Sequence, residues 1–434
     1  MADPLTLSVR AFLESSAFDI AEAATAAELE LRSGEVVLTQ LHDRASHTVR
    51  DVVRAPAVVL ARWLAGNWWR LRWEPLRGTQ PDADWLLSHE LGGAGGGVLW
   101  PAVRFASDGA HILVSSRACS PGAGLRYLTV ASFSVSGLRF ERAIDDFIDQ
   151  VMRRLSDRGV DDPPLRVLWG DVLAERRDPE AALLRRREAQ LGLDPDQVDP
   201  ADVIALFEQG AWLGAGACEE ALVDVGFHGA AARLEQLRRL SVDAAARLPL
   251  DLGAFASTQA AWRSAPAAGD APWARAAQLA ARVRADLGLG DGPISTPRLG
   301  ALLCADLSDP PAPAAPIAVA FGSGERWGFL PRKTRPTSLR FDLARALGDA
   351  LDRPEGDRAL PLTAASTSRQ RFQRAFAQEL LCPVEVAAAR VSEADDVGEA
   401  IEDLAADFEV SSWVVRTALV NHGHLDRGAL PAAP

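Results

Sequence analysis

The hydrophobic positions of the first 160 residues switch between helix-like and strand-like spacing. Apolar residues from Phe140 to Leu155 recur at intervals of three and four, which predicts an amphipathic helix with one buried face. A second helix is predicted over 56–69, starting at a proline. Short apolar runs flanked by turn residues predict strands over 28–40, 98–115 and 125–135, with turns at Ser33-Gly34 and Asp108-Gly109. Residues 1–160 are therefore expected to form an α+β domain.

Breaks in this pattern divide the rest of the chain. The prolines of Asp161–Pro164 mark the first boundary, and residues 165–263 have mostly helical spacing. A linker is predicted over Ser264–Pro272, and a last domain over 273–428. That domain is expected to contain a helix over 273–287, strands over 317–321 and 327–330, and further helices. The predicted fold class is α+β and multidomain, with a helical middle region.

Composition narrows the class of protein. Hydrophobic residues make up 48% of the 434 residues and charged residues 24%, which is typical of globular proteins and excludes general disorder. The net charge of −13 disfavours nucleic acid as a partner, because nucleic-acid binders usually present a basic face. The chain has neither a long uncharged apolar stretch nor the pattern of a secretory signal, so we expect a cytoplasmic protein without membrane association. The widely spaced cysteines predict neither a disulfide framework nor a zinc ribbon.

Tryptophan and arginine cluster just after the predicted helix over 56–69. Trp and Arg dominate the energetics of many interfaces, so Trp69, Arg70 and Arg72 are candidate residues for binding a partner. The alternative interpretation is that the tryptophan rings of this segment pack into the core of the N-terminal domain.

Two histidine-containing segments are candidates for catalysis. His89 and Glu90 match the first half of the zinc-binding sequence HExxH, but Gly93 stands where the second histidine is needed. His422 and His424 form an HxH pair, which supplies two metal ligands without a third. A metal-dependent hydrolase or peptidase using one of these segments is therefore an alternative function.

Residues 404–419 have the spacing of a helix-turn-helix, with Val410-Ser411 in the turn. A DNA-binding regulator is a further alternative. The second helix offers only Arg416 as a cation, although contacts to phosphate supply most non-specific DNA affinity. Packing of this segment within its own domain is the favoured interpretation.

Several short segments of the last third occur in the order found in one peptidase family. They are Arg340–Ala344 (RFDLA), Phe376–Pro383 (FAQELLCP) and Phe408–Ser411 (FEVS), preceded by the predicted strands over 317–330. In these segments the chain resembles the ImmA/IrrE family of metallopeptidase-like proteins. The resemblance implies a zincin-like C-terminal domain. In that family an HExxH helix supplies two zinc ligands and a catalytic base, and the helix carrying FAxELLxP supplies an acidic third ligand.

This chain departs from the family at the catalytic positions. The resemblance places Arg345-Ala346-Leu347-Gly348-Asp349 where HExxH is expected, and Gln370 near the third ligand. Arg345 has no lone pair for a metal, and Ala346 cannot act as a base. We therefore expect a degenerate cleft with no metal, no cofactor and no catalytic residue, formed by Arg345, Ala346, Asp349, Gln370 and Glu379. Arg345 and Asp349 are expected to form an ion pair across one helical turn.

These expectations combine into a non-catalytic protein that works by binding. The degenerate peptidase-like domain would be a scaffold or a peptide-binding cleft, and the partners would be proteins of unknown identity. By resemblance alone, a role in bacterial defence or stress regulation is expected.

Overall fold

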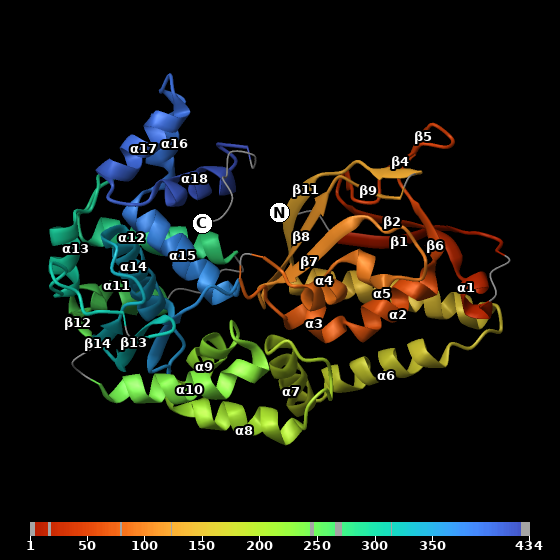
Figure 1. Cartoon of the computed structure of the whole chain (residues 1–434), viewed down its shortest axis with the longest axis horizontal. Helices are drawn as coiled ribbons and strands as arrows, with labels where there is room; N and C mark the ends of the chain where they lie inside the picture. Colours follow the sequence, from red (N-terminus) through yellow and green to blue (C-terminus); the bar gives the residue numbers. More distant parts are fainter. Residues whose placement is uncertain are drawn as a thin grey trace. The chain divides into compact units, whose positions relative to one another are not determined.

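The computed structural model describes residues 5–15, 19–78, 80–122, 124–243, 247–264, 271–313 and 315–426. The chain divides into two compact units, residues 1–204 and 205–434, with the boundary inside helix α8 (Pro200–Gly210) (Figure 1). The centre of the predicted linker, 265–270, lies outside the described residues. None of the described helices has the length and apolar character needed to cross a membrane.

Antiparallel sheets and one long helix organise the first unit. Strands β1, β2, β3 and β6 form one sheet, β5, β4, β10 and β9 a second, and β7, β8 and β11 a third. The strands are β1 Leu5–Phe12, β2 Ala26–Ser33, β3 Val36–Val37, β4 Leu41–Asp43, β5 Thr48–Arg50, β6 Val53–Pro56, β7 Ala102–Ser107, β8 His111–Arg117, β9 Cys119–Gly122, β10 Leu125–Tyr127 and β11 Ala131–Ser136. The helices are α1 Ile20–Ala24, α2 Ala57–Gly66, α3 Trp68–Trp73, α4 Ala83–His89, η1 Leu91–Ala94, α5 Gly137–Asp157, α6 Pro163–Arg177 and α7 Pro179–Gln190.

Several elements of this unit agree with the pattern of apolar and turn residues. Helix α5 buries the predicted stripe, and the hairpin of β7 and β8 turns at Gly109, whose φ of 92° favours glycine. The helix predicted over 56–69 is divided at Asn67, whose side chain caps α2 by donating to the Trp63 carbonyl. The strand predicted over 125–135 is also divided, because β10 pairs with β4 whereas β11 pairs with β8.

The second unit consists of helices around one antiparallel sheet with the strand order β12-β14-β13-β15. Its strands are β12 Leu248–Asp251, β13 Ala318–Ser323, β14 Arg326–Leu330 and β15 Ala359–Leu362. Its helices, after α8, are η2 Ala211–Leu213, α9 Ala215–Leu222, α10 Gly226–Val242, η3 Gly253–Phe255, α11 Ala256–Ser264, α12 Pro272–Asp286, α13 Thr296–Leu303, α14 Pro336–Asp352, α15 Ser368–Leu381, α16 Val384–Ser392, α17 Val397–Asp407 and α18 Ser412–Asn421. Helices α12, α14 and α15 pack against one another (Figure 1), and α9 packs against β15.

The mixed α+β class is confirmed, and the sheet of the second unit has two strands, β12 and β15, that the sequence pattern does not predict. Both β12 and β15 have four residues and contain a proline, Pro249 or Pro361. Proline lacks the N–H needed in the middle of a sheet, and both strands accordingly lie at its edges. The helices predicted as one middle region are shared between the units, with α6 and α7 in the first and α9 and α10 in the second.

Arg340 ties the start of α14 to two loops of the second unit. Its side chain is 1% exposed and donates to the carbonyls of Ile294, Phe408 and Glu409. Nη1 also lies 3.1 Å from a carboxylate oxygen of Glu409, in the turn between α17 and α18. Two of the segments that carry the family resemblance, 340–344 and 408–411, are therefore in direct contact.

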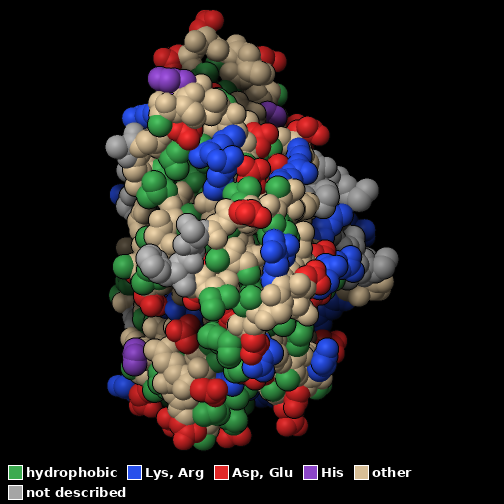
Figure 2. All heavy atoms as spheres, turned by 90° about the vertical axis from the view of Figure 1, so that its right-hand side faces the viewer, with side chains coloured by type: hydrophobic (Ala, Val, Ile, Leu, Met, Phe, Trp, Pro, Cys, Tyr) green, Lys and Arg blue, Asp and Glu red, His purple; other side chains and the backbone are tan. Residues whose placement is uncertain are grey.

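Charges of both signs lie on the face drawn in Figure 2. Figure 2 shows a face on which Lys and Arg side chains are interspersed with Asp and Glu side chains and with hydrophobic ones. On this face, opposite charges can therefore compensate one another locally.

Candidate functional site

Arg345, at the predicted position of the first metal ligand, forms the centre of a buried polar cluster in the second unit. It lies on α14, and its side chain is 9% exposed. Nη2 donates to Oε1 of Gln370 at 2.6 Å, to the Thr363 carbonyl at 3.0 Å and to Oε1 of Gln373 at 3.2 Å. Burial lowers the pKa of Arg345, and Asp342, at 3.5 Å from Nη1, opposes this shift. A positive charge therefore occupies the position that the resemblance assigns to the first metal ligand.

Gln370 is completely buried on α15, and its amide is fully used. Oε1 accepts from Arg345 and, at 3.0 Å, from the backbone N–H of Thr363. Nε2 donates at 2.9 Å to both the Pro361 carbonyl and Oε2 of Glu220. An amide has two donors and two acceptor positions, so Gln370 has no capacity left for another ligand.

Asp349 belongs to the same cluster, but its partner differs from the predicted one. The Arg369 guanidinium donates to both Asp349 carboxylate oxygens, at 2.7 and 2.8 Å, and to Asp357 at 2.6 Å. The predicted ion pair between Arg345 and Asp349 is therefore wrong. Arg369 lies on the facing helix α15 and can approach the carboxylate with the two-pronged geometry that favours Arg–carboxylate pairs.

Glu220, on α9, also belongs to the cluster, although no sequence motif predicts it. It accepts from Thr367 Oγ1 at 2.7 Å and from Gln370 Nε2 at 2.9 Å. Burial raises the pKa of Glu220, although the Arg369 charge acts in the opposite direction. No local pattern connects Glu220 with Gln370, because the two lie 150 residues apart. Gln373 does carry a signal, since it follows Gln370 by three residues and shares its helix face.

Ala346 and Glu379 do not join this cluster. Ala346 is 1% exposed and packs in the apolar core. Glu379 lies roughly 13 Å further along α15 than Gln370, at 1.5 Å of rise per residue. Its carboxylate accepts from the Val384 N–H and lines a separate pocket of about 440 Å³ with Arg284. The placement of Glu379 in the degenerate cleft is therefore corrected.

The cluster can form hydrogen bonds and hold charge, but it offers no reactive group in a metal-binding arrangement. Among the described residues, no group of three or more His, Cys, Asp or Glu side chains is placed to hold a metal ion. The acidic groups here, Asp349 and Glu220, are bound by Arg369, Thr367 and Gln370.

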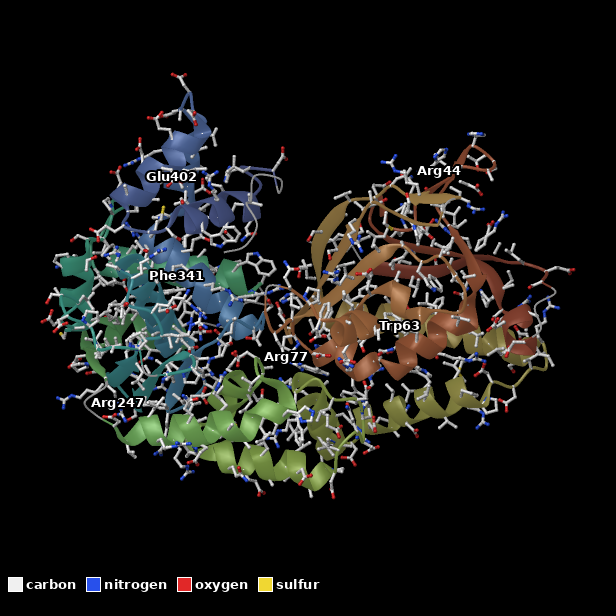
Figure 3. All side chains as sticks on the ribbon, viewed as in Figure 1. Arg44, Trp63, Arg77, Arg247, Phe341 and Glu402 are labelled. Atoms are coloured by element: carbon white, nitrogen blue, oxygen red, sulfur yellow. The ribbon has the colours of Figure 1, made fainter. Side chains whose placement is uncertain are left out.

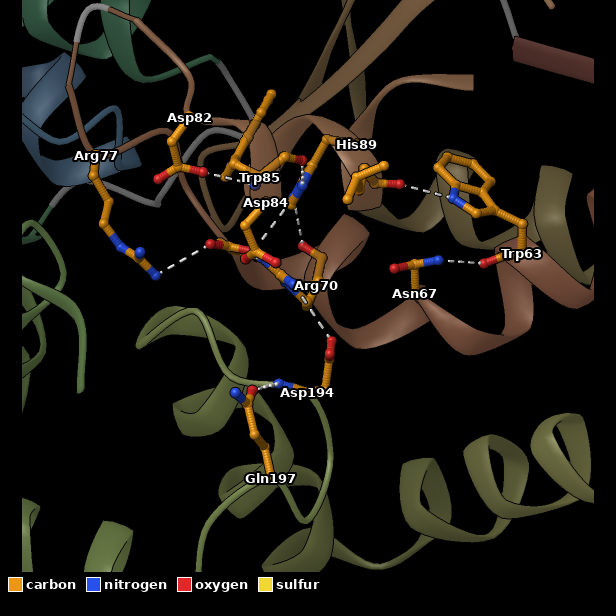
Figure 4. A network of polar contacts seen from close by, with 12 residues as sticks. Trp63, Asn67, Arg70, Arg77, Asp82, Asp84, Trp85, His89, Asp194 and Gln197 are labelled. Carbon is orange, nitrogen blue, oxygen red and sulfur yellow. Dashed lines mark hydrogen bonds and ion pairs between the residues drawn. The ribbon is translucent and has the colours of Figure 1, made fainter. Parts of the chain in front are cut away.

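His89, the first alternative catalytic residue, lies in a polar network of the first unit (Figure 4). It is fully buried and stacks on Trp85, with ring centroids 4.0 Å apart. Its ring nitrogens face the carbonyls of Trp85, at 2.8 Å, and Arg70, at 3.2 Å. Burial lowers the pKa of His89 to about 3, so the ring is neutral at physiological pH. Glu90 is paired with Arg104 at 2.9 Å.

The predicted interaction residues Trp69, Arg70 and Arg72 are all buried, at 4%, 3% and 7% exposure. Trp69 Nε1 donates to Glu175 at 2.7 Å. Arg70 donates to Glu74 at 2.6 Å, as does Arg72 to Glu141. The proposal that these side chains bind a partner is corrected, because they stabilise the interior of their own unit.

The C-terminal candidates lie on α17 and α18. The segment over 404–419 forms the expected helix, turn and helix. The cation Arg416 lies 3.6 Å from Glu402. Glu402, labelled in Figure 3, lies on α17, which also carries Glu399 and Asp403. Nδ1 of His422 lies 2.9 Å from the Ala418 carbonyl, at the end of α18. The acidic side chains of α17 disfavour contact with phosphates.

No family model matches the chain, and no curated protein or solved structure matches it significantly. Its function is therefore argued from the geometry of the site.

Proposed function

We propose that the protein is a non-catalytic binding protein, and that its second unit is an ImmA/IrrE-like, zincin-like domain that has lost metal and catalysis. The observation that carries this proposal is the hydrogen bonding of Arg345 to Gln370, Gln373 and Thr363. The guanidinium joins the expected ligand positions on α14 and α15 to one another.

Electrostatics supports the loss of a metal. A divalent ion 4 Å from the Arg345 guanidinium would be repelled by about 8 kcal/mol at an effective dielectric constant near 20. Structural zinc contributes on the order of 10–16 kcal/mol at full coordination. With Asp349 held by Arg369, and with Gln370 bonded at both ends of its amide, too little coordination remains to overcome that repulsion.

Catalysis would need a base as well as a metal. Ala346 stands at the position of the expected base and has no group that can accept a proton. A domain without metal and base can still bind a partner. If its cleft derives from a peptidase, the ligand that we expect it to bind is a peptide segment of a partner protein. A cytoplasmic role in bacterial defence or stress regulation belongs to the same proposal and rests on the resemblance.

Hydrolysis of an unstructured protein such as casein tests this proposal directly. The full chain, incubated with added zinc, is expected to release no peptides above a buffer blank. Peptide release that a chelator abolishes would overturn the proposal. Single substitutions of His89, His422, His424 and Asp349 would then locate the active site.

A further inference from the structure

Two guanidinium groups from different helices meet at the loop between β15 and α15. Arg345 of α14 donates to the Thr363 carbonyl at 3.0 Å, and Arg374 of α15 donates to the Ala365 carbonyl at 3.0 Å. Carbonyls two residues apart are separated by at most about 7 Å, so the two donating nitrogens are at most about 13 Å apart, and the Arg345 charge acts on Arg374. The loop thus holds two positive charges beside the buried cluster.

Polar atoms at this position lack partners within the described residues. Arg345 Nε is buried without a hydrogen-bond acceptor, and Thr363 Oγ1, on a residue that is 3% exposed, is buried without any partner. For Arg374, the Ala365 carbonyl is the hydrogen-bond partner that the structure shows, although a guanidinium has five N–H donors. Buried polar groups are normally paired, so unpaired donors at one place indicate a missing acceptor.

The local charge balance indicates that this acceptor is an anion. Asp342 lies 3.5 Å from Nη1 of Arg345 and is the carboxylate paired with that guanidinium, and the Asp349 charge also acts on Arg345. Burial and the positive charges of Arg345 and Arg371 lower the pKa of Arg374 to about 9, and the Glu220 charge opposes this shift. Burial raises the pKa of Asp342, and the positive charges of Arg345, Lys333 and Arg332 oppose this shift, so Lys333 and Arg332 add to the positive charge acting at this place. Positive charge is thus concentrated here in a chain whose net charge is −13.

We propose that Arg374, together with Arg345 and Thr363, binds a carboxylate of an acidic peptide segment in a partner protein. The inference rests on the proposed function, because it names the group that the binding cleft accepts. A guanidinium matches a carboxylate in a two-pronged geometry, and the Thr363 hydroxyl can donate to the same group. A nucleic acid is disfavoured because its affinity depends on several phosphate contacts along an extended basic surface.

The test is fluorescence anisotropy of a labelled hexaglutamate peptide titrated with the full chain. Hexaglutamine and a single-stranded DNA hexamer serve as comparison probes. The variants are R374Q, which removes the charge, and R374K, which keeps the charge without the planar fork. R390Q is the matched control, because Arg390 lies on α16 and is paired with Asp407 at the surface. Thermal unfolding of each variant verifies that it is folded.

We expect salt-sensitive binding of hexaglutamate that R374Q weakens about tenfold or more, the loss of one charge-assisted pair. R374K should bind with intermediate affinity, and R390Q should stay within about twofold of the wild type. Hexaglutamine should not bind. Equal binding by the wild type, R374Q and R390Q, or no binding at all, would overturn the inference, and stronger binding of DNA would overturn the ligand class.

The failure of this inference can be told apart from the failure of the proposed function. Zinc content and casein hydrolysis are measured on the same preparation. If the protein contains no zinc, does not cleave casein and does not bind hexaglutamate, only the proposed carboxylate site is refuted. A protein that contains zinc and cleaves casein refutes the proposed function itself.

Discussion

The Arg345 guanidinium and the Gln370 side-chain amide form a 2.6 Å hydrogen bond between α14 and α15. Under the proposed ImmA/IrrE-like origin, side chains at these two positions once met at a metal ion. Here they meet each other, with Gln373 and the Thr363 carbonyl as further acceptors for the same guanidinium. This hydrogen bond therefore helps to hold α14 and α15 together. Arg345 brings a positive charge to this place but no group that could act in catalysis.

Removing this guanidinium should destabilise the protein strongly. Arg345→Ala removes the Arg345 donor from the Thr363 carbonyl and from Gln373 Oε1, and one of two donors from Gln370 Oε1, which we expect to lower the free energy of unfolding by about 2–4 kcal/mol. Urea denaturation followed by circular dichroism measures the difference. Arg390→Ala, at a surface ion pair, should change stability by less than about 0.5 kcal/mol. Equal effects of the two substitutions would contradict a structural role for Arg345.

Arg340 should hold the turn between α17 and α18. Glu409 in that turn has a φ of 51°, a conformation that costs a residue with a side chain about 1–2 kcal/mol. Arg340→Met removes the hydrogen bonds to Phe408 and Glu409, so hydrogen exchange should become faster at 408–411 and at 294–296. Arg416→Met, which loses only a 3.6 Å contact to Glu402, is the control. Unchanged protection in Arg340→Met would refute this tether.

Glu220 should make stability depend on pH. Burial raises the pKa of Glu220 above its ordinary value of 4.5, so the folded chain binds this proton more tightly than the unfolded chain. The contribution of Glu220 to stability is therefore lost as pH rises from 4.5 through its folded pKa. We expect Glu220→Gln to gain stability relative to the wild type over that interval. Unfolding at a series of pH values tests this, with the exposed Glu393→Gln as control; a relative stability independent of pH would contradict it.

His89 should have the opposite dependence. Burial lowers the pKa of His89 from 6.5 to about 3, so the unfolded chain binds a proton in this interval that the folded chain does not. Stability should thus be lost as pH falls below 6.5, and His89→Asn should reduce that loss. Nitrogen NMR of the imidazole is expected to show a neutral ring down to at least pH 5. A His89 resonance that titrates near pH 6.5 would contradict the burial.

Local features of the sequence account for much of the fold. The three-and-four spacing predicts α5, and Asp108-Gly109 predicts the hairpin of β7 and β8, because each depends on neighbouring residues. The edge strands β12 and β15 escape prediction because they are short and contain proline. They form strands because β12 pairs with β14 and β15 pairs with β13.

The candidate site is predictable only in part, for a similar reason. The resemblance indicates that Arg345, Asp349 and Gln370 lie together, and the structure places them in one cluster. The resemblance does not predict that Asp349 binds Arg369 or that Gln370 binds Glu220. These contacts depend on how α15 and α9 pack, which the local sequence does not indicate. Trp69, Arg70 and Arg72 are residue types that are common at interfaces, but here their side chains are buried within the first unit.

The most direct test of the central claim is the metal content of the full chain, purified without chelators or metal-affinity tags and measured by mass spectrometry. Arg345 in place of a metal predicts zinc far below one ion per chain, even after incubation with excess zinc and gel filtration. A retained content close to one zinc per chain would contradict the account, because the Arg345 cluster and a bound metal cannot share the same place.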